Sequence, residues 1–303
     1  MSEEQLRAIA RNEEVKRQTT LIVDIVKYIK HFFDVYGTDK KRKDELSEHV
    51  IKLINLDPEL YTAQNVGGQN LGMICADFGL EKVVLYVLDN YAASVQQDCN
   101  GLNLGMYAAR NKMEIAVLKA LDNKTASVQV NSDGSNIGLM SARRAMRRAV
   151  LKSLQNKKSS VQQDNHGFNL GMLCADYGWA KETWLALDNE KASIQQNEEG
   201  YNIGMLSARH SSEEVKKEME KCVCKALDNK IASKQQSDMA ERTIGIYAIV
   251  NNLPLASERA ISNPEARVLI DSAGKSMEDY YHANKNLVRL LLEKYDRELI
   301  HGR

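Results

Sequence analysis

The sequence predicts an all-α protein built as a helical repeat solenoid with a helical cap at its N- and C-terminal ends. Two features of the composition and one pattern predict this fold class. Only 3 of the 303 residues are Pro and 6% are aromatic, which favours helices joined by short loops over a β-sandwich. A motif of the form Gly-x-Asn-Leu/Ile-Gly also recurs at a constant spacing. Such recurrence, at a period of about 20–50 residues, is the signature of stacked repeat units.

The repeated units follow one another at an offset of 33 residues. Five of them begin with a glycine, at Gly68, Gly101, Gly134, Gly167 and Gly200. A sixth copy begins at Glu241, 41 residues after the fifth, so the fifth unit carries an insertion of eight. We expect a capping box at Ser211–Glu214 to start the second helix of that unit. The insertion should lengthen this helix and brace the C-terminal cap, the alternative being that the protruding helix contacts a partner.

Each unit is predicted to hold two short helices and a polar turn. In the unit that begins at Gly101, the first helix starts near Gly105 and the second spans residues 114–121. A polar turn then runs from Ala126 to Gly134. Neither helix buries its apolar face alone, so the units must stack on one another.

Over roughly residues 45–250, these units resemble the ankyrin repeat. Gly79 and Gly178 match the glycine between the two helices of that repeat, and one alanine per unit matches its small-residue position. These alanines are Ala76, Ala109, Ala142, Ala175 and Ala208. The Thr-Pro-Leu-His of the family is replaced by Asn-Leu/Ile-Gly-Met/Leu, so we expect an asparagine to cap the first helix. These asparagines are Asn70, Asn103, Asn136, Asn169 and Asn202. Another α-solenoid is the alternative.

The predicted boundaries divide the chain into three parts. Residues 1–67 form an N-terminal helical cap that includes a half repeat, residues 68–250 hold the repeats, and residues 251–303 form a C-terminal helical cap. The basic run Lys40–Lys43 is interpreted as a solvated loop between the first helices. Near the other end, Pro264 is predicted to lie in the first turn of a helix, and a last helix is expected at about Ser276–Ile300.

No motif typical of an enzyme, metal or cofactor site occurs, so no catalytic residue, metal or cofactor is expected. Cys75 and Cys174 occupy the repeat position of Ala108, which favours small packing residues over reactive thiols. Cys222 and Cys224 would point apart on a helix and could not share a metal. The alternative is an enzyme with a site in a terminal helical region, the repeats serving in substrate recognition.

Two positions near the end of each first helix vary while their surroundings repeat. By resemblance to the ankyrin arrangement, the first helices line a concave face, where these side chains would form a groove that binds another protein. Arginines and aromatic residues favour such a role. Together with Arg147, the predicted partner-binding residues are Phe78, Arg110, Asn111, Arg143, Arg144, Tyr177, Arg209 and His210. The alternative is that these positions vary only because they are exposed. A companion position, six residues after each first glycine, is apolar and predicted to be core.

Charge is balanced over the whole chain but concentrated in the third unit. Lys+Arg and Asp+Glu both total 41, so no general attraction to nucleic acid or an anionic membrane is expected. Arg143, Arg144, Arg147 and Arg148 are expected on one side of a helix, where they favour an anionic partner. An acidic protein segment, a phosphopeptide or a phosphoinositide head group fits this charge. Pairing of the arginines with Asp176 or with acids of a cap is the alternative.

The sequence also predicts where the protein acts. It has no apolar run long enough to span a bilayer, no secretory signal at its start, and five cysteines without a framework spacing. We therefore expect a cytoplasmic protein with free thiols. The abundant Lys, Asn and Gln and the altered repeat resemble the ankyrin proteins that intracellular bacterial pathogens deliver into host cells. That resemblance implies an effector delivered without a Sec signal.

Overall fold

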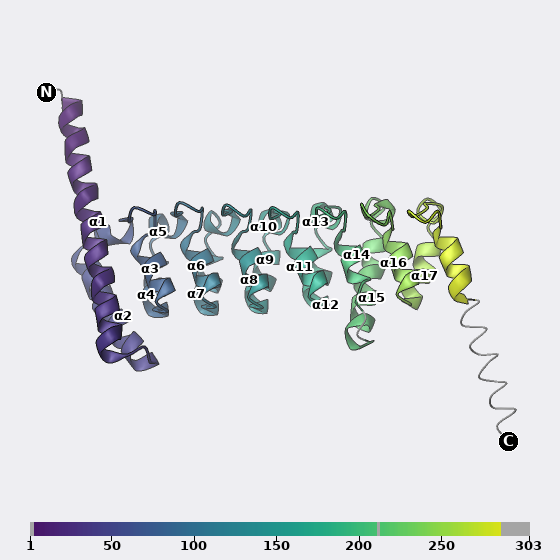
Figure 1. The fold of residues 1–303 in the computed structure, drawn as a ribbon, viewed down its shortest axis with the longest axis horizontal. Helices are drawn as coiled ribbons and strands as arrows, with labels where there is room; N and C mark the ends of the chain where they lie inside the picture. Colours follow the sequence, from purple (N-terminus) through teal and green to yellow (C-terminus); the bar gives the residue numbers. More distant parts are fainter. Residues whose placement is uncertain (1–2, 211–212, 286–303) are drawn as a thin grey trace, which may run out of the picture. The chain divides into compact units, whose positions relative to one another are not determined.

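The computed structural model describes residues 3–210 and 213–285, and it divides into two compact units, residues 1–162 and 163–303 (Figure 1). Both units are built from short helices. Within the described residues, the only β-type pairings are isolated antiparallel bridges at the bases of turns, such as Gln97 with Asn103. No helix in the described part of the chain combines the length and apolarity needed to cross a membrane.

The first unit begins with two longer helices and continues with repeated helix pairs. Its elements are α1 (Glu3–Tyr36), α2 (Lys40–Leu56), η1 (Pro58–Tyr61), α3 (Leu71–Asp77), α4 (Glu81–Val87), α5 (Tyr91–Val95), α6 (Leu104–Arg110), α7 (Glu114–Ala120), η2 (Ala126–Val128), α8 (Ile137–Arg143), α9 (Arg147–Leu154) and α10 (Lys157–Ser160). The helix pair predicted in the unit of Gly101 is confirmed as α6 and α7. The one-turn helices α5, η2 and α10 were not predicted.

The second unit repeats the same order. Its elements are α11 (Leu170–Asp176), α12 (Ala180–Ala186), α13 (Glu190–Ser193), α14 (Ile203–Ser207), α15 (Glu213–Leu227), η3 (Ala232–Lys234), α16 (Ile244–Val250) and α17 (Pro254–Ile261). Residues 277–285 are helical as well.

In the first five repeats the first helix begins at a buried asparagine, as the sequence predicts. The Asn103 side chain accepts a hydrogen bond from the backbone N–H of Met106 at 3.0 Å. The other four asparagines cap α3, α8, α11 and α14 in the same way. The amide also donates, from Asn103 Nδ2 to the carbonyl of Ala126 at 2.9 Å and to Gln129 Oε1 at 2.8 Å. Each asparagine therefore ties the start of a first helix to the one-turn segment that ends the same repeat.

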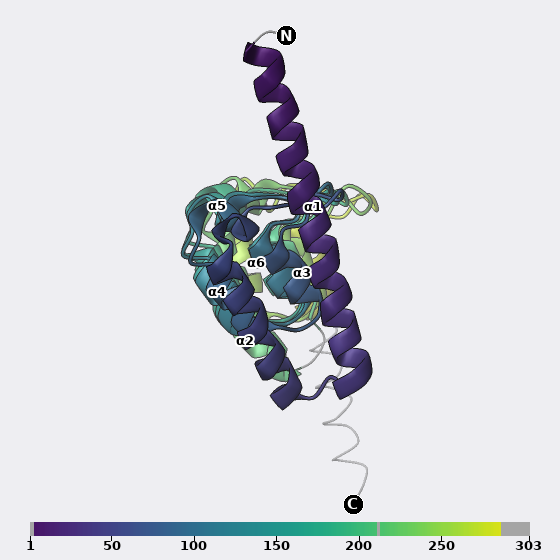
Figure 2. The same ribbon diagram turned by 90° about the vertical axis from the view of Figure 1, so that its left-hand side faces the viewer.

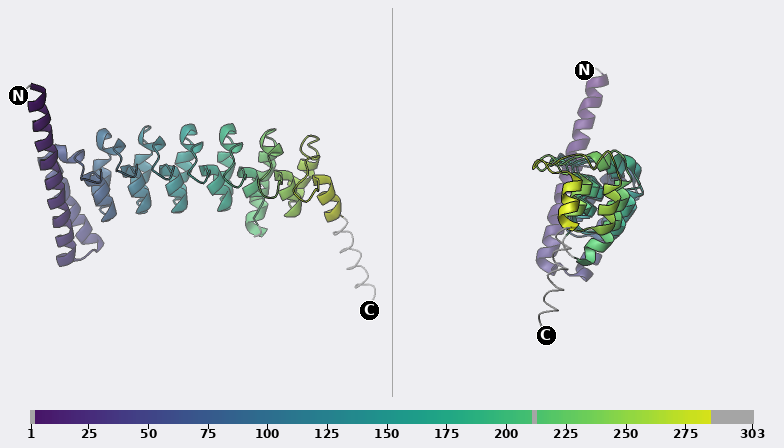
Figure 3. Two further views of the ribbon diagram at one scale, coloured as in Figure 1. Left: turned by 45° about the horizontal axis from the view of Figure 1, so that its top comes forward. Right: turned by 90° about the vertical axis from the view of Figure 1, so that its right-hand side faces the viewer.

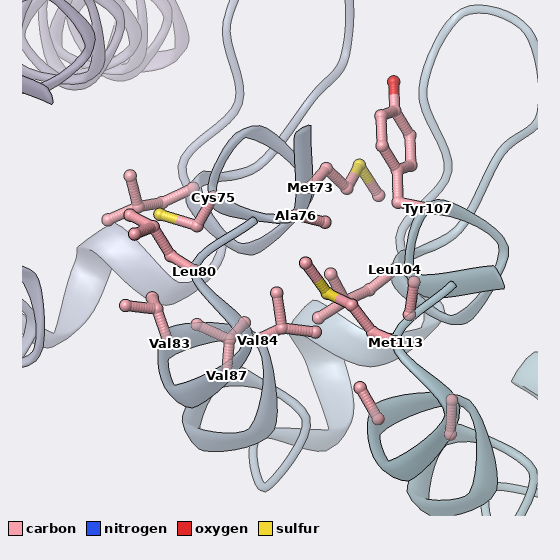
Figure 4. Close-up of a cluster of buried hydrophobic side chains, with 14 of the residues drawn as sticks. Met73, Cys75, Ala76, Leu80, Val83, Val84, Val87, Leu104, Tyr107 and Met113 are labelled. Carbon is pink, nitrogen blue, oxygen red and sulfur yellow. The ribbon is translucent and has the colours of Figure 1, made fainter. Parts of the chain in front are cut away.

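The second glycine of the motif allows close helix packing. A Cβ atom on Gly105 would lie 2.5 Å from Ile137 Cδ1 and 2.7 Å from Ala120 Cβ. The equivalent glycines of α11 and α14 are equally crowded, and a Cβ atom on that of α3, Gly72, would lie 2.8 Å from Val87. Figure 4 shows the resulting core, in which Leu104 and Met113 of one repeat lie beside Val84 and Val87 of the previous one. The recurring glycine motif is thus confirmed as architectural.

Polar ladders connect successive repeats. Lys119 Nζ donates to the carbonyl of Leu85 at 2.8 Å and pairs with Asp89 at 2.7 Å. Gln129 Nε2 donates to the carbonyl of Val95, 34 residues earlier, at 2.7 Å. Equivalent contacts recur elsewhere in both units. The repeated Leu-Asp-Asn and Gln-Gln sequences therefore hold neighbouring repeats together.

The turn between the two helices of a repeat requires a left-handed residue. Gly79 and Gly178 provide it at φ 75° and 70°, but in the third repeat Ala145 adopts φ 59°. A residue with a Cβ atom pays about 1–2 kcal/mol for this conformation. The turn of the third repeat is therefore strained.

We expect Ala145→Gly to raise the free energy of unfolding by about 0.5–1 kcal/mol, because relief of strain exceeds the extra chain entropy of glycine. Ala142→Gly, in the preceding helix α8, is the control and should lower it by about 1 kcal/mol. Urea denaturation followed by circular dichroism measures both. Destabilisation by Ala145→Gly would contradict the strain.

The N-terminal helices α1 and α2 form an antiparallel pair against the first repeat (Figure 2). Ile25 and Ile29 of α1 are buried in the core of the first unit. The basic run Lys40–Lys43, predicted to be a loop, is instead the first turn of α2, because Asp39 caps the helix by accepting from the N–H of Arg42 at 3.0 Å.

The insertion in the fifth repeat divides into two parts. Leu227 lies 27 residues after Gly200, whereas Leu187 lies 20 residues after Gly167, so seven of the extra residues extend the second helix. The eighth enlarges the turn before Arg242. Accordingly α15 has 15 residues and α12 has 7, one of the additional residues being Leu227, whose equivalent Leu187 lies just beyond α12. The seven inserted residues add about two turns, so the packed face of the helix keeps its direction. The predicted capping box at Ser211–Glu214 includes residues 211–212, which lie outside the described part.

Helix α15 contacts the end of the second unit through Glu220. This residue lies seven residues before Leu227, as Glu114 lies seven before Leu121, and so is not an inserted residue. The N-terminal end of α15 projects past the neighbouring second helices of that unit (Figure 3). That the inserted residues brace the C-terminal end stays a prediction.

Glu220 is buried and its Oε1 accepts from the N–H groups of Leu255 at 2.8 Å and Ala256 at 3.3 Å. Because the N-cap residue Leu253 makes no side-chain bond, Glu220 supplies the missing cap of α17.

Beyond residue 250 the repeated contacts continue within the second unit. Gly274 takes φ 71° at the base of a turn, and Ile270 bridges to Ser276 as Gln97 does to Asn103. Pro264 lies in a turn, so the prediction that it starts a helix is wrong, and Pro254 instead lies in the first turn of α17. Part of the last predicted helix, residues 286–300, lies outside the described residues. A closing cap at 251–303 stays a prediction.

Candidate functional site

In the first unit, the two predicted binding residues at the end of α6, Arg110 and Asn111, contact Asp77 at the end of α3. Arg110 pairs with Asp77 at 2.5 Å, and Asn111 Nδ2 donates to the same carboxylate at 3.1 Å. The guanidinium also lies over the Tyr107 ring, 4.4 Å from its centre. Partial burial opposes the charge of Arg110, but the hydrogen bond and charge of Asp77 outweigh it and raise the pKa of Arg110. Arg110 and Asn111 are therefore held by the fold.

Phe78 is already engaged by the N-terminal helix α1. Its ring centre lies 6.0 Å from that of Phe33, and its side chain is half-buried. Phe78 also packs against the small buried cluster of Ile22, Ala63 and Ile74. Little of its surface is open to a partner.

The four arginines of the third repeat do not share one side of a helix, contrary to the prediction. Helix α8 ends at Arg143 and α9 begins at Arg147, because Ala145 takes the left-handed conformation between them. All four are exposed. Arg143 donates to Ser135 Oγ at 2.6 Å, and Arg148 lies 3.9 Å from Glu114. The arginines therefore bracket the turn at the end of a first helix.

In the second unit, the predicted residues combine aromatic and basic groups. Tyr177 is 43% exposed, and its ring centre lies 5.1 Å from that of Trp179. Arg209 is exposed and lies over the Tyr201 ring at 4.7 Å. His210 is half-buried, and its Nε2 donates to the carbonyl of Ala175 at 2.5 Å.

The aromatic partners Trp179 and Tyr201 were missed by sequence reasoning. Tyr201 directly follows the first glycine of its unit, a position that also varies from repeat to repeat. The same comparison of equivalent positions could have found it. Trp179 stands where the other repeats carry Leu80, Met113 and Met146, so only its size distinguishes it.

The positions predicted to be structural are confirmed as core. The companion position is buried at Ile74, Tyr107, Leu173 and Leu206 and partly buried at Met140. Cys75 and Cys174 are fully buried. Burial raises the pKa of the Cys75 thiol far above its usual range, and burial raises that of Cys222 to about 12. Burial thus disfavours the thiolate, the form that acts as a nucleophile, at both residues.

The N-terminal helices enclose a pocket, which is where the enzyme alternative would place a site. Its lining residues are Tyr28, His31, Phe32, Tyr36, Arg42, Glu45 and His49. Tyr28 and His49 are linked by a 2.8 Å hydrogen bond between the hydroxyl and Nδ1. None of the described residues that line this pocket is a Ser, Thr or Cys. The enzyme alternative also covers the region from Asn251 onward, where a second pocket is lined in part by Ser257, Glu258 and Tyr281. Among the described residues of the whole chain, no group of three or more His, Cys, Asp or Glu could hold a metal ion.

No protein-family model and no curated protein matches the sequence. Solved structures do match. An ankyrin repeat protein, EF0377, superposes with a TM-score of 0.51 at 16% identity, over 66% of this chain and 98% of that one. The ankyrin repeat domain of Bcl-3, a member of the IkappaB protein family, gives 0.52 at 14% identity, over 71% and 92%. The chain has the ankyrin-repeat fold.

The ankyrin-repeat fold confirms the predicted all-α repeat solenoid and the resemblance on which that prediction rests. It is reached here with a different helix start, since asparagine replaces the Thr-Pro-Leu-His of the usual repeat. In this fold the ends of α3, α6 and α8 in one unit, and of α11 and α14 in the other, carry the variable side chains.

Proposed function

We propose that this ankyrin-repeat chain is a protein-binding scaffold and not an enzyme. Its partner binds through the side chains at the ends of the first helices, in the groove that the fold family places there. The observation that carries the proposal is a difference between the repeated residues and several of the variable ones. The repeated residues are occupied by bonds inside the fold, as Asn103, Gln129 and Lys119 are, whereas the variable residues Arg144, Tyr177 and Arg209 are exposed.

The partner of the first unit is an acidic or phosphorylated protein segment. Arg143, Arg144 and Arg147 present guanidinium groups around one exposed turn, and guanidinium forms its strongest hydrogen bonds with carboxylate and phosphate. A protein segment is favoured over a phosphoinositide head group because the balanced net charge gives the chain no general attraction to a membrane surface.

The setting of this interaction follows from the sequence resemblance. The altered repeat and the abundance of Lys, Asn and Gln support an effector of an intracellular bacterium, delivered into the host cytoplasm without a Sec signal. The partner is then a host protein.

Affinity capture from host-cell lysate, followed by mass spectrometry, tests the scaffold. Arg143→Glu/Arg144→Glu is expected to lose the principal captured protein, because the substitutions put negative charge where the partner is acidic. Lys124→Glu/Lys158→Glu makes the same change in net charge at exposed lysines away from the first helices and is the control that should retain it. Equal recovery by all three proteins would contradict the proposal.

A further inference from the structure

One pair of repeat positions is used differently in the two units. Asp77 and Arg110 are 33 residues apart, and Asp176 and Arg209 occupy the same positions three repeats further along the array. The first pair forms an ion pair at 2.5 Å. Among the described residues, neither Asp176 nor Arg209 has a partner of opposite charge within 4.0 Å. The ion pair that forms at these positions in the first unit is therefore absent from the described residues of the second unit.

Neighbouring residues explain the difference. In the first unit, Asn111 donates to Asp77 and helps to hold it against Arg110. In the second unit, His210 stands at the position of Asn111 and donates to the carbonyl of Ala175 instead. Asp176 thus lacks the second donor that fixes Asp77.

The tyrosine on which the arginine stacks also occupies a different position in the two units, so the arginine side chains point differently. In the first unit, Arg110 stacks on Tyr107, which lies on its own helix α6. In the second unit, the ring is on Tyr201, in the turn before α14, and Leu206 occupies the position of Tyr107. Arg209 follows the ring and leaves its N–H groups exposed.

An aromatic surface adjoins Asp176 and Arg209. Tyr177 directly follows Asp176 in the sequence, is 43% exposed and packs against Trp179. A partly exposed aromatic pair binds an apolar side chain at little cost in conformational entropy, because its rings are already held. The second unit thus presents a carboxylate, a guanidinium and an aromatic contact from the helices α11 and α14, which pack together.

We propose that the second unit docks an extended peptide segment that supplies a carboxylate to Arg209, a cation to Asp176 and an apolar side chain to Tyr177. This proposal rests on the proposed scaffold function and names the chemistry of its partner. Packed helices lie about 8–10 Å apart. In an extended segment of polyproline II type, which advances about 3.1 Å per residue with three residues per turn, an acidic and a basic residue three positions apart lie on one face at about this spacing.

The probe is a peptide that binds the full chain. It is selected from a displayed library of random peptides about twelve residues long. Enriched peptides are expected to carry an acidic and a basic residue three positions apart with an apolar residue near the basic one. Fluorescence anisotropy then gives the dissociation constant of a selected peptide. We expect Arg209→Ala to weaken binding by about tenfold or more, whereas the matched Arg110→Ala should change it by less than about twofold.

A charge exchange completes the test. Asp176→Lys/Arg209→Glu should bind a peptide with its two charges exchanged about tenfold more tightly than the original peptide. Both positions are exposed and without a described ion-pair partner, so this variant should keep the circular dichroism of the wild type.

The possible failures are distinguishable. Peptides that enrich without the charge pattern, or that bind the exchanged variant unchanged, would overturn the docking of this segment while leaving the scaffold function intact. A library with no enriched peptide would contradict both proposals. Equal weakening by Arg110→Ala and Arg209→Ala would also overturn the assignment to the second unit.

Discussion

Replacing Asn103 by alanine is expected to lower the free energy of unfolding by about 3 kcal/mol or more. The substitution removes the cap of α6, which contributes about 1 kcal/mol. It also leaves the carbonyl of Ala126 and Gln129 Oε1 without the donor that Asn103 provides in the buried interior. A buried acceptor that loses its partner costs about 1–3 kcal/mol. Urea denaturation followed by circular dichroism measures the change.

Threonine is the matched control at this position. In the sixth repeat Thr243 takes the place of the asparagine, and its Oγ1 accepts from the N–H of Ile246 at 3.3 Å. Asn103→Thr keeps an acceptor for the helix start and loses the two donated bonds. It should therefore destabilise the protein by about 1 kcal/mol less than Asn103→Ala. Equal stability of the alanine variant and the wild type would show that these bonds contribute nothing.

Gly105→Ala is expected to lower the free energy of unfolding by about 2–3 kcal/mol. In an ordinary helix the same change is stabilising by about 1 kcal/mol, because alanine loses less chain entropy on folding. Here the added Cβ atom would lie 2.5 Å from Ile137 Cδ1 and 2.7 Å from Ala120 Cβ, so the two helices must move apart. Overpacking of this kind costs about 1–3 kcal/mol and separates neighbouring repeats. The sign of the change is the diagnostic result.

A second substitution identifies the contact responsible. Ile137→Val removes Cδ1 and alone should cost about 1 kcal/mol. Combined with Gly105→Ala, it should recover part of the lost stability, so the effects of the two changes are not additive. Strict additivity in urea denaturation would mean that the added methyl group does not meet Ile137.

The repeat motif predicts the fold because its residues act at one position in every unit. The helix pairs, the capping asparagine and the buried cysteines all follow from local chemistry repeated in register. The ladders formed by Lys119 and Gln129 could not be predicted in this way, because each joins carbonyls 34 residues away. A residue pattern does not reveal which backbone groups two stacked units leave without partners.

The candidate site is less predictable than the fold, because its side chains also depend on contacts between stacked repeats. The arginines of the third repeat read as a helical run, although the repeat register places Ala145 at the position of the inter-helix glycines Gly79 and Gly178 and could have predicted the break. Asp77 with Arg110 and Asp176 with Arg209 are also identical as sequence pairs. One pair forms an ion pair and the other does not. This difference depends on the surrounding residues, and only the structure places those residues in contact.

In the proposed function, the repeated residues hold this protein together and the variable residues at the ends of the first helices bind its partner. The most direct test of that division is the free energy of unfolding of Arg143→Glu/Arg144→Glu, measured on the preparation used for affinity capture. We expect it to stay within about 1 kcal/mol of the wild type, as for exposed charges, while the partner is lost. A loss of about 3 kcal/mol or more would place these arginines in an internal ion-pair network and contradict their role in binding.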